Sequence, residues 1–130
     1  MKHKGCISEI LVERDEYIVR LFRKLKRTCQ YASMYDICEV MASRPVPRHF
    51  LSEKMAYIIW STWKQTHRLP TGSHPHKRRL YESLVSTCER MKDTGLNNSE
   101  VIRRALDEPA RCLGISPYGI FAILKKRKQK

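Results

Sequence analysis

The chain has 130 residues and an apolar content of 42%, which suits one globular domain or two very small ones and excludes wholesale disorder. Lysine and arginine number 26 against 13 acidic residues, so the formal net charge is +13. A domain this basic usually meets a polyanion, because Lys and Arg side chains displace counterions from phosphate backbones. A need for solubility explains the charge less well, since acidic residues serve that purpose at least as well.

The cysteines and the hydropathy of the chain bear on where it works. No apolar run is long enough to span a bilayer, and the start of the chain lacks the hydrophobic segment of a signal peptide. The five cysteines are scattered and odd in number, and several fall on predicted apolar helix faces. Buried thiols suit a reducing compartment better than a disulfide framework does. We therefore expect a cytoplasmic protein that does not bind membranes.

The first half of the chain predicts three helices. The first covers about 8–29, with one apolar stripe and basic residues over much of the remaining surface. The second begins at Ser33, where Asp36 three residues later is typical of a capping box. It ends near Ser43, because the prolines that follow cannot continue a helix. The third begins after Ser52, an N-cap in front of apolar residues at helical spacing.

The second half predicts three more helices after a break. Turn-forming residues and histidines fill 67–76, which is the best linker candidate in the chain. A helix is expected at about 75–93, two more lie within 97–127, and a basic tail follows. Apolar–polar alternation is nowhere sustained, so no strand is predicted. The expected fold is all-α, with two tandem three-helix units, at 1–66 and 77–130, packed as one compact helical domain.

The pattern of the first unit returns 64 residues later. Pro45 falls on Pro109, and the capping Ser52 falls on Ser116, with no gap between the two stretches. Any two amphipathic helical stretches align tolerably. A turn proline and a cap serine that recur in register nevertheless favour an internal duplication.

Each unit contains a helix, a proline turn and a second helix, at 33–64 and at 97–127. This order is helix–turn–helix-like, and in that motif the second helix enters the major groove of DNA. About eight residues separate the helices here, more than the three or four of the compact turn. A homeodomain-like or winged arrangement is compatible with that length. The alternative is a plain bundle of capped helices.

Candidate nucleic-acid contacts lie on the turns, on the second helix of each unit and at the start of the fourth helix. Arg44 and Arg48 stand on a loop stiffened by prolines, which suits bidentate phosphate contacts, although Arg48 can instead cap helix carbonyls. The second unit lacks the counterparts of Arg48 and His49, so we expect the first unit to be the more specific reader. The predicted contact residues are Arg44, Arg48, His49, Lys54, Tyr57, Lys64, Lys77, Arg78, Arg111, Lys125, Lys126, Arg127 and Lys128.

Residue types typical of catalysis or metal binding form no motif. Paired C-x-x-C spacing is missing, and His74-Pro-His76 alone lacks nearby partners. No nucleophile motif or glycine-rich phosphate loop is present. Trp60 and Trp63 can stack on unpaired bases, but their helical spacing favours a place in the core. We expect no enzyme, no cofactor and no metal.

The turn of the first unit carries a resemblance. The stretch 45–52, PVPRHFLS, is followed by an acidic residue that opens the next helix. It resembles the Pro-x-Pro-Arg-aromatic-x-Ser turn of small uncharacterised bacterial proteins, which look like helix–turn–helix proteins of phage or mobile-element type. His49 stands where those proteins carry a large aromatic. The resemblance covers about a third of the chain and implies a fold, but no mechanism.

These observations together predict a nucleic-acid-binding protein with a regulatory or architectural role. Duplex DNA is preferred to RNA, because helices and not a stacking sheet carry the positive charge. The alternative is a helical protein–protein interaction module that docks on an acidic partner. Two units in one chain can replace a dimer, or the chain can itself form a homodimer.

Overall fold

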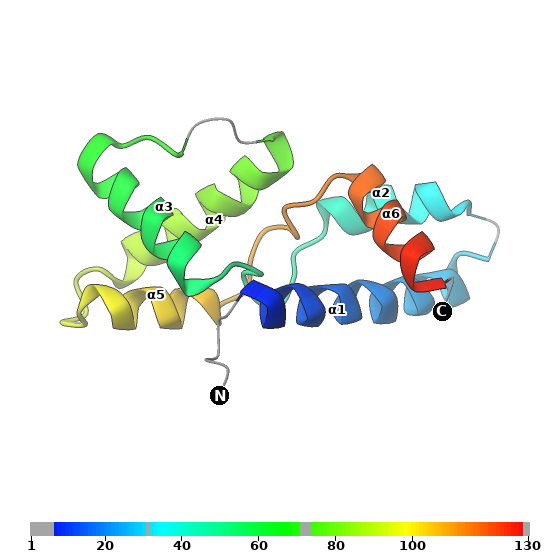
Figure 1. The fold of residues 1–130 in the computed structure, drawn as a ribbon, viewed down its shortest axis with the longest axis horizontal. Coiled ribbons are helices and arrows are strands. Elements are labelled where there is room, and N and C mark those ends of the chain that lie inside the picture. Colours follow the sequence, from blue (N-terminus) through cyan, green and yellow to red (C-terminus); the bar gives the residue numbers. More distant parts are fainter. Residues whose placement is uncertain (1–6, 31, 71–73, 129–130) are drawn as a thin grey trace.

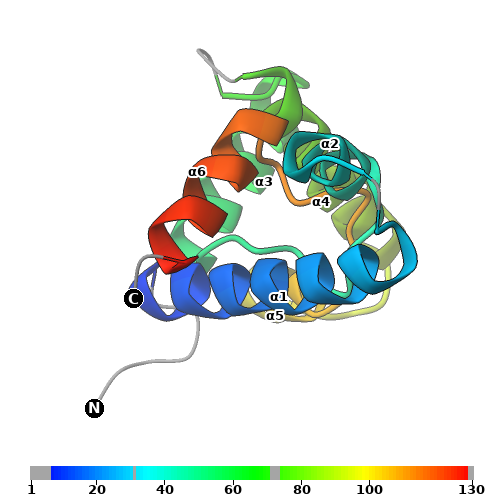
Figure 2. The same cartoon turned by 90° about the vertical axis from the view of Figure 1, so that its right-hand side faces the viewer.

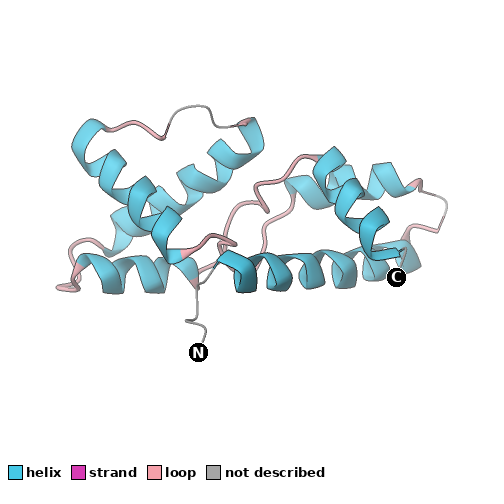
Figure 3. Ribbon diagram, in the orientation of Figure 1, coloured by secondary structure: helices cyan, strands magenta, loops and turns pink. Residues whose placement is uncertain are grey.

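The computed structural model describes residues 7–30, 32–70 and 74–128, and it confirms the all-α fold. Loops join the helices, and no strand occurs within those ranges (Figure 3). The predicted linker at 67–76 lies partly, and the end of the basic tail wholly, outside the described residues. In chain order the helices are α1 (Ile7–Thr28), α2 (Met34–Ser43), α3 (Glu53–Thr66), α4 (Pro75–Met91), α5 (Asn98–Leu106) and α6 (Pro117–Lys128).

Side-chain caps begin the helices at the predicted positions. Ser33 Oγ accepts a hydrogen bond from the Asp36 amide at 3.1 Å, and the Asp36 carboxylate accepts one from the Ser33 amide at 3.3 Å. Ser52 and Ser116 each accept from the amide three residues later, both at 3.1 Å. Such caps contribute about 1 kcal/mol each. The starts of α2, α3 and α6 therefore follow from local sequence.

The helices pack in two groups, and each group takes helices from both predicted sequence units. α1, α2 and α6 form the first group, on the right of Figure 1, and α3, α4 and α5 form the second. The proline turns carry the chain from one group to the other. As a result α2 packs against α6, and α3 packs against α5. The predicted helix–turn–helix pairs at 33–64 and 97–127 do not pack as compact motifs, so that character is not confirmed.

Each group has its own hydrophobic core. The first core contains Ile18, Met41 and Ile120 from three different helices, all with no exposed surface. The second contains Ile59, Leu84 and Ala105, which are equally buried. The partly buried Leu51 packs against both cores.

The two helices that follow the proline turns share one face of the molecule. Seen along the long axis, α3 and α6 lie on one side, α1 and α5 lie on a second, and α2 and α4 lie on the third (Figure 2). This placement decides which exposed side chains can meet the same partner.

Candidate nucleic-acid interface

α3 separates its apolar and polar side chains cleanly. Ala56, Ile59 and Trp60 are buried, so Trp60 has the core role that its spacing predicts. Lys54 and Tyr57 are exposed on the opposite surface, Tyr57 to 54%. The helix therefore presents a cation and an aromatic ring to solvent, one turn apart.

Lys64, in the last turn of α3, is exposed, and its ammonium group contacts two neighbouring side chains. Its ammonium donates a hydrogen bond of 2.9 Å to Asn98 Oδ1 at the start of α5. It also lies 5.4 Å from the centroid of the Trp60 ring. These contacts fix the position of the charge without neutralising it.

α6 carries the densest predicted cluster of cations. Lys125, Lys126 and Arg127 are exposed, whereas the side chain of Lys128 lies outside the described residues. Lys125 lies 5.5 Å from the centroid of the Phe121 ring. At the other end of the helix Tyr118 is 74% exposed, and its ring is 5.1 Å from that of Tyr35 on α2. α6 thus offers an aromatic side chain at its start and cations at its end.

The structure also assembles a basic groove, of which the predicted contact set contains Arg127 but not Arg20 or Arg23. Arg20 and Arg23 of α1 line a shallow groove of about 380 Å³ together with Arg127 of α6. Guanidinium groups suit phosphate oxygens, because their planar fork donates two parallel hydrogen bonds. The basic run at 23–27 gave a sequence signal for Arg23, but such runs are more often solvated faces.

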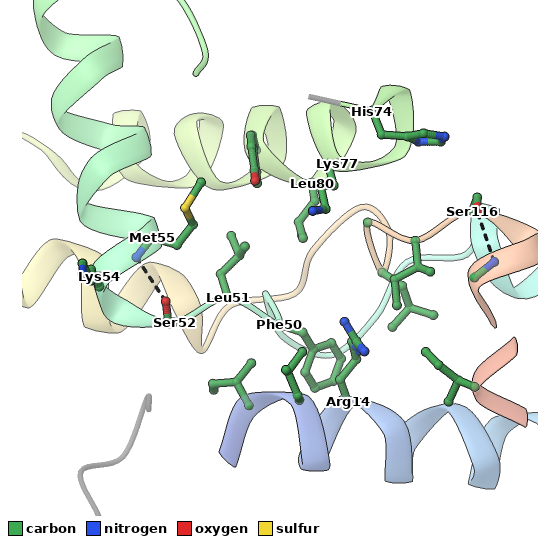
Figure 4. Close-up of a pocket in the computed structure, with 18 of the residues that line it drawn as sticks. Arg14, Phe50, Leu51, Ser52, Lys54, Met55, His74, Lys77, Leu80 and Ser116 are labelled. Carbon is green, nitrogen blue, oxygen red and sulfur yellow. Dashed lines mark hydrogen bonds between the residues drawn. The ribbon is translucent and has the colours of Figure 1, made fainter. Parts of the chain in front are cut away.

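Lys54 and Lys77 both line a second and larger groove. It has a volume of about 730 Å³ and lies between α1, α3, α4 and α6 (Figure 4). Two predicted contact residues that are far apart in the sequence thus line the same groove, Lys54 from α3 and Lys77 from α4.

The prediction that His49 contacts nucleic acid is wrong. Its side chain has no exposed surface, and its Nε2 lies 2.9 Å from Ser83 Oγ on α4. Burial lowers the pKa of this imidazole, against the effect of nearby hydrogen bonds. His49 belongs to the interior because its loop turns inward where the two helix groups meet.

Arg48 is half-buried and already has a partner. Its guanidinium pairs with the Glu13 carboxylate of α1 at 3.2 Å and lies 5.9 Å from the Phe50 ring centroid. It does not cap helix carbonyls, the alternative that the sequence left open. Its charge is therefore less available to a phosphate than that of a free arginine.

The remaining predicted cations are exposed on loops or at the start of α4. Arg44 lies on the first proline turn, and Lys77 and Arg78 lie in the first turn of α4. Arg111 lies on the second turn, where its backbone amide donates to Ser83 Oγ at 3.1 Å. That bond anchors the loop and leaves the Arg111 side chain in solvent.

The described cysteines are free thiols, and three of them are buried. Burial raises the pKa of Cys38 to about 11 and that of Cys88 to about 12, so both thiols stay protonated near neutral pH. Within the described ranges, no group of three histidine, cysteine or acidic side chains could hold a metal ion. None of the helices described is long and apolar enough to cross a membrane.

Comparison of the chain with protein-family models, with curated proteins and with solved structures finds no match.

Proposed function

We propose that this protein binds nucleic acid, preferably duplex DNA, and serves a regulatory or architectural role. One observation carries the proposal: α3 and α6 lie on the same face, and both expose cations in a chain of net charge +13. Such a face attracts a phosphate backbone through counterion release, whatever the base sequence. The exposed Tyr57 and Tyr118 add groups that can contact sugars or base edges.

The exchange of helices gives each group the parts of a helix–turn–helix domain. In the second group α4 would be the support helix and α5 would correspond to the first helix of the motif. α3 would correspond to the second helix, which enters the major groove and is called the reading helix below. In the first group α1, α2 and α6 take the same places. The reading helix comes from the other sequence unit in each case. Two reading helices in one chain would do the work that most helix–turn–helix proteins achieve by dimerisation.

The wider proposal covers location and chemistry. Free thiols at Cys29, Cys38, Cys88 and Cys112 are what a reducing cytoplasm would maintain, which supports a cytoplasmic location. We propose no catalytic role, because the buried thiols are poor nucleophiles. Kinship with bacterial proteins that share the Pro-x-Pro-Arg turn is part of the same proposal.

Fluorescence anisotropy with labelled duplex DNA, titrated at several salt concentrations, tests the proposal. The logarithm of the association constant should fall linearly with the logarithm of salt concentration. Lys125→Gln with Lys126→Gln should reduce that slope by about 0.9 for each phosphate that the variant no longer neutralises. Competition with single-stranded and duplex RNA of the same length tests the preference for DNA.

A matched control removes the same charge elsewhere. Arg90→Gln with Arg104→Gln changes exposed residues of α4 and α5, which lie off the proposed face. This pair should leave the salt slope nearly unchanged. Equal effects of the two pairs would mean attraction by net charge alone. No binding even at low salt would sink the nucleic-acid proposal and direct attention to an acidic protein partner.

A further inference from the structure

The larger groove lies where the two helix groups meet, on the face that carries α3 and α6. Its volume is about 730 Å³, and side chains from α1, α3, α4, α6 and the two proline-turn loops line it. Figure 4 shows Leu51, Met55 and Leu80 around the opening between α1, α3 and α4. Most of the lining is apolar, and the volume is within the range of about 300–1,000 Å³ typical of small-molecule sites.

The apolar lining reaches solvent. Leu11 of α1 is 39% exposed and Ile58 of α3 is 41% exposed, and both line the groove. Apolar surface held in contact with water is an unfavourable arrangement that an apolar ligand would relieve. The interior of the groove therefore favours a hydrocarbon or aromatic body.

The polar groups of the groove are mostly cationic. Lys54 and Lys77 approach it from α3 and α4, and neither ammonium has an ion-pair or hydrogen-bond partner among the described residues. Arg14 lines the groove from α1, although its guanidinium is 3.0 Å from the Asp15 carboxylate. The side-chain oxygens of Ser52 and Ser116 are already engaged as helix caps. The unpaired charge at this site is thus positive.

We propose that this groove binds a small amphipathic anion, with its apolar body against Leu51 and Ile58 and its anionic head at Lys77, beside Leu80 on α4 (Figure 4). Charge complementarity decides the occupant. A second copy of the chain would bring another +13 against a basic rim, and a duplex nucleic acid keeps its bases stacked in its interior. The groove shares Lys54 and Lys77 with the predicted nucleic-acid contacts, but its apolar lining has no part in that proposal.

The test uses the full chain and the fluorescent fatty acid 11-(dansylamino)undecanoic acid. We expect saturable binding of one probe per chain, with a blue shift of its emission and displacement by dodecanoate. Lys54→Gln with Lys77→Gln should weaken dodecanoate binding by about tenfold, because it removes the ionic contact at Lys77 and the positive charge of Lys54 on the same rim. Displacement of the probe by dodecan-1-ol, which has no charge, should be the same before and after this change.

Two controls keep the result interpretable. Lys24→Gln with Arg27→Gln removes the same charge from exposed positions of α1 that do not line the groove, and should leave probe binding unchanged. Ile58→Glu places a carboxylate at the mouth on an exposed position, and should abolish binding of dodecanoate while the chain stays folded by circular dichroism.

Four results would overturn the proposal. They are no saturable probe binding, equal losses in the two charge-removing pairs, dodecanoate affinity unchanged by Lys54→Gln with Lys77→Gln, and a dimer in sedimentation that excludes the probe. The last would mean that a second copy covers the groove. DNA binding is measured in a separate titration without the probe, so failure of either proposal leaves the other standing.

Discussion

Val46 and Ala110 lie 64 positions apart and exchange both backbone hydrogen bonds, at 2.9 Å in each direction. Each residue directly follows the turn proline of its own unit. A mutual antiparallel pair between equivalent positions implies a local two-fold relationship between the two proline turns. The bridge therefore lies at the point where the chain crosses from one helix group to the other, in both directions.

Equivalent side-chain contacts flank this bridge. In the first unit the Tyr17 ring lies 5.6 Å from the Phe50 ring. In the second, Leu80 lies against Gly114. Gly114 follows Phe50 by 64 positions, and Leu80 follows Tyr17 by 63, because the support helices of the two units align one residue out of step. The pair Tyr17 and Phe50 is large and the pair Leu80 and Gly114 is smaller, and the two pairs lie on opposite sides of the bridge. The internal duplication stays a prediction; in the structure, the last helix of each unit packs in the group of the other unit.

The exchange predicts how the halves of the chain behave. Residues 1–66 and 67–130, produced separately, should not fold as monomers, because the apolar stripes of α3 and α6 each pack in the group of the other half. Mixing them should restore helicity and a 1:1 complex, measured by circular dichroism and analytical ultracentrifugation. A cooperatively folded monomer of 1–66 would contradict the exchanged arrangement. A homodimer of that fragment would agree with it, since two copies can exchange α3.

Gly114 should tolerate no side chain. Its φ is +80°, and a Cβ would lie 2.5 Å from Leu80 Cδ2. Gly114→Ala should lower the free energy of unfolding by about 2–4 kcal/mol, from the left-handed backbone and the overpacking together. Gly95→Ala is the matched control, because Gly95 has a φ of +81° with no atom within 4 Å. It should cost only about 1 kcal/mol in urea unfolding. Equal losses in the free energy of unfolding for the two variants would show that the Leu80 side chain moves aside without a measurable cost.

His49 should make the protein sensitive to acid. Burial holds its pKa below the usual value near 6.5, so the folded state binds fewer protons than the unfolded state as pH falls. Stability is then fully present above about pH 6.5 and is lost below it, by at most about 1.4 kcal/mol per pH unit. Urea midpoints measured from about pH 8 to pH 5 would show this loss.

Replacing the histidine separates its effect from that of other groups. His49→Gln should lower stability at pH 8 and flatten the acid dependence, because the titrating group is gone. His76→Gln is the control, since burial lowers the pKa of that more accessible imidazole as well. The control should keep most of the slope. If His49→Gln keeps the full slope, another group causes the acid loss.

Arg48 should matter little to nucleic-acid binding. Its pairing with Glu13 at 3.2 Å predicts that Arg48→Gln changes the salt slope by less than about 0.3, whereas Lys126→Gln lowers it by about 0.9. The ion pair itself should contribute less than about 1 kcal/mol to stability. Anisotropy titrations and urea unfolding of both variants measure the two quantities. A larger slope change for Arg48→Gln would mean that the pair opens on binding.

The sequence by itself determined where the helices begin and which of their faces are apolar. Ser33, Ser52 and Ser116 cap amides three residues away, and a proline is excluded from the interior of a helix, so both signals act within a few residues. Those signals do not determine which other helices each helix packs against. The apolar stripe of α3 does not by its spacing distinguish α1 and α2 from α4 and α5, with which it packs.

The tertiary structure alone decided which helices meet and which cations gather. Hydrophobic attraction has no direction, so the partner of a stripe depends on where the loops carry the rest of the chain. Here the bridge between Val46 and Ala110 holds the loops in a crossed arrangement. That crossing buries His49, sets Arg127 beside Arg23, and opens the groove between α3 and α6. No local pattern shows these results, because each joins residues that are distant in sequence.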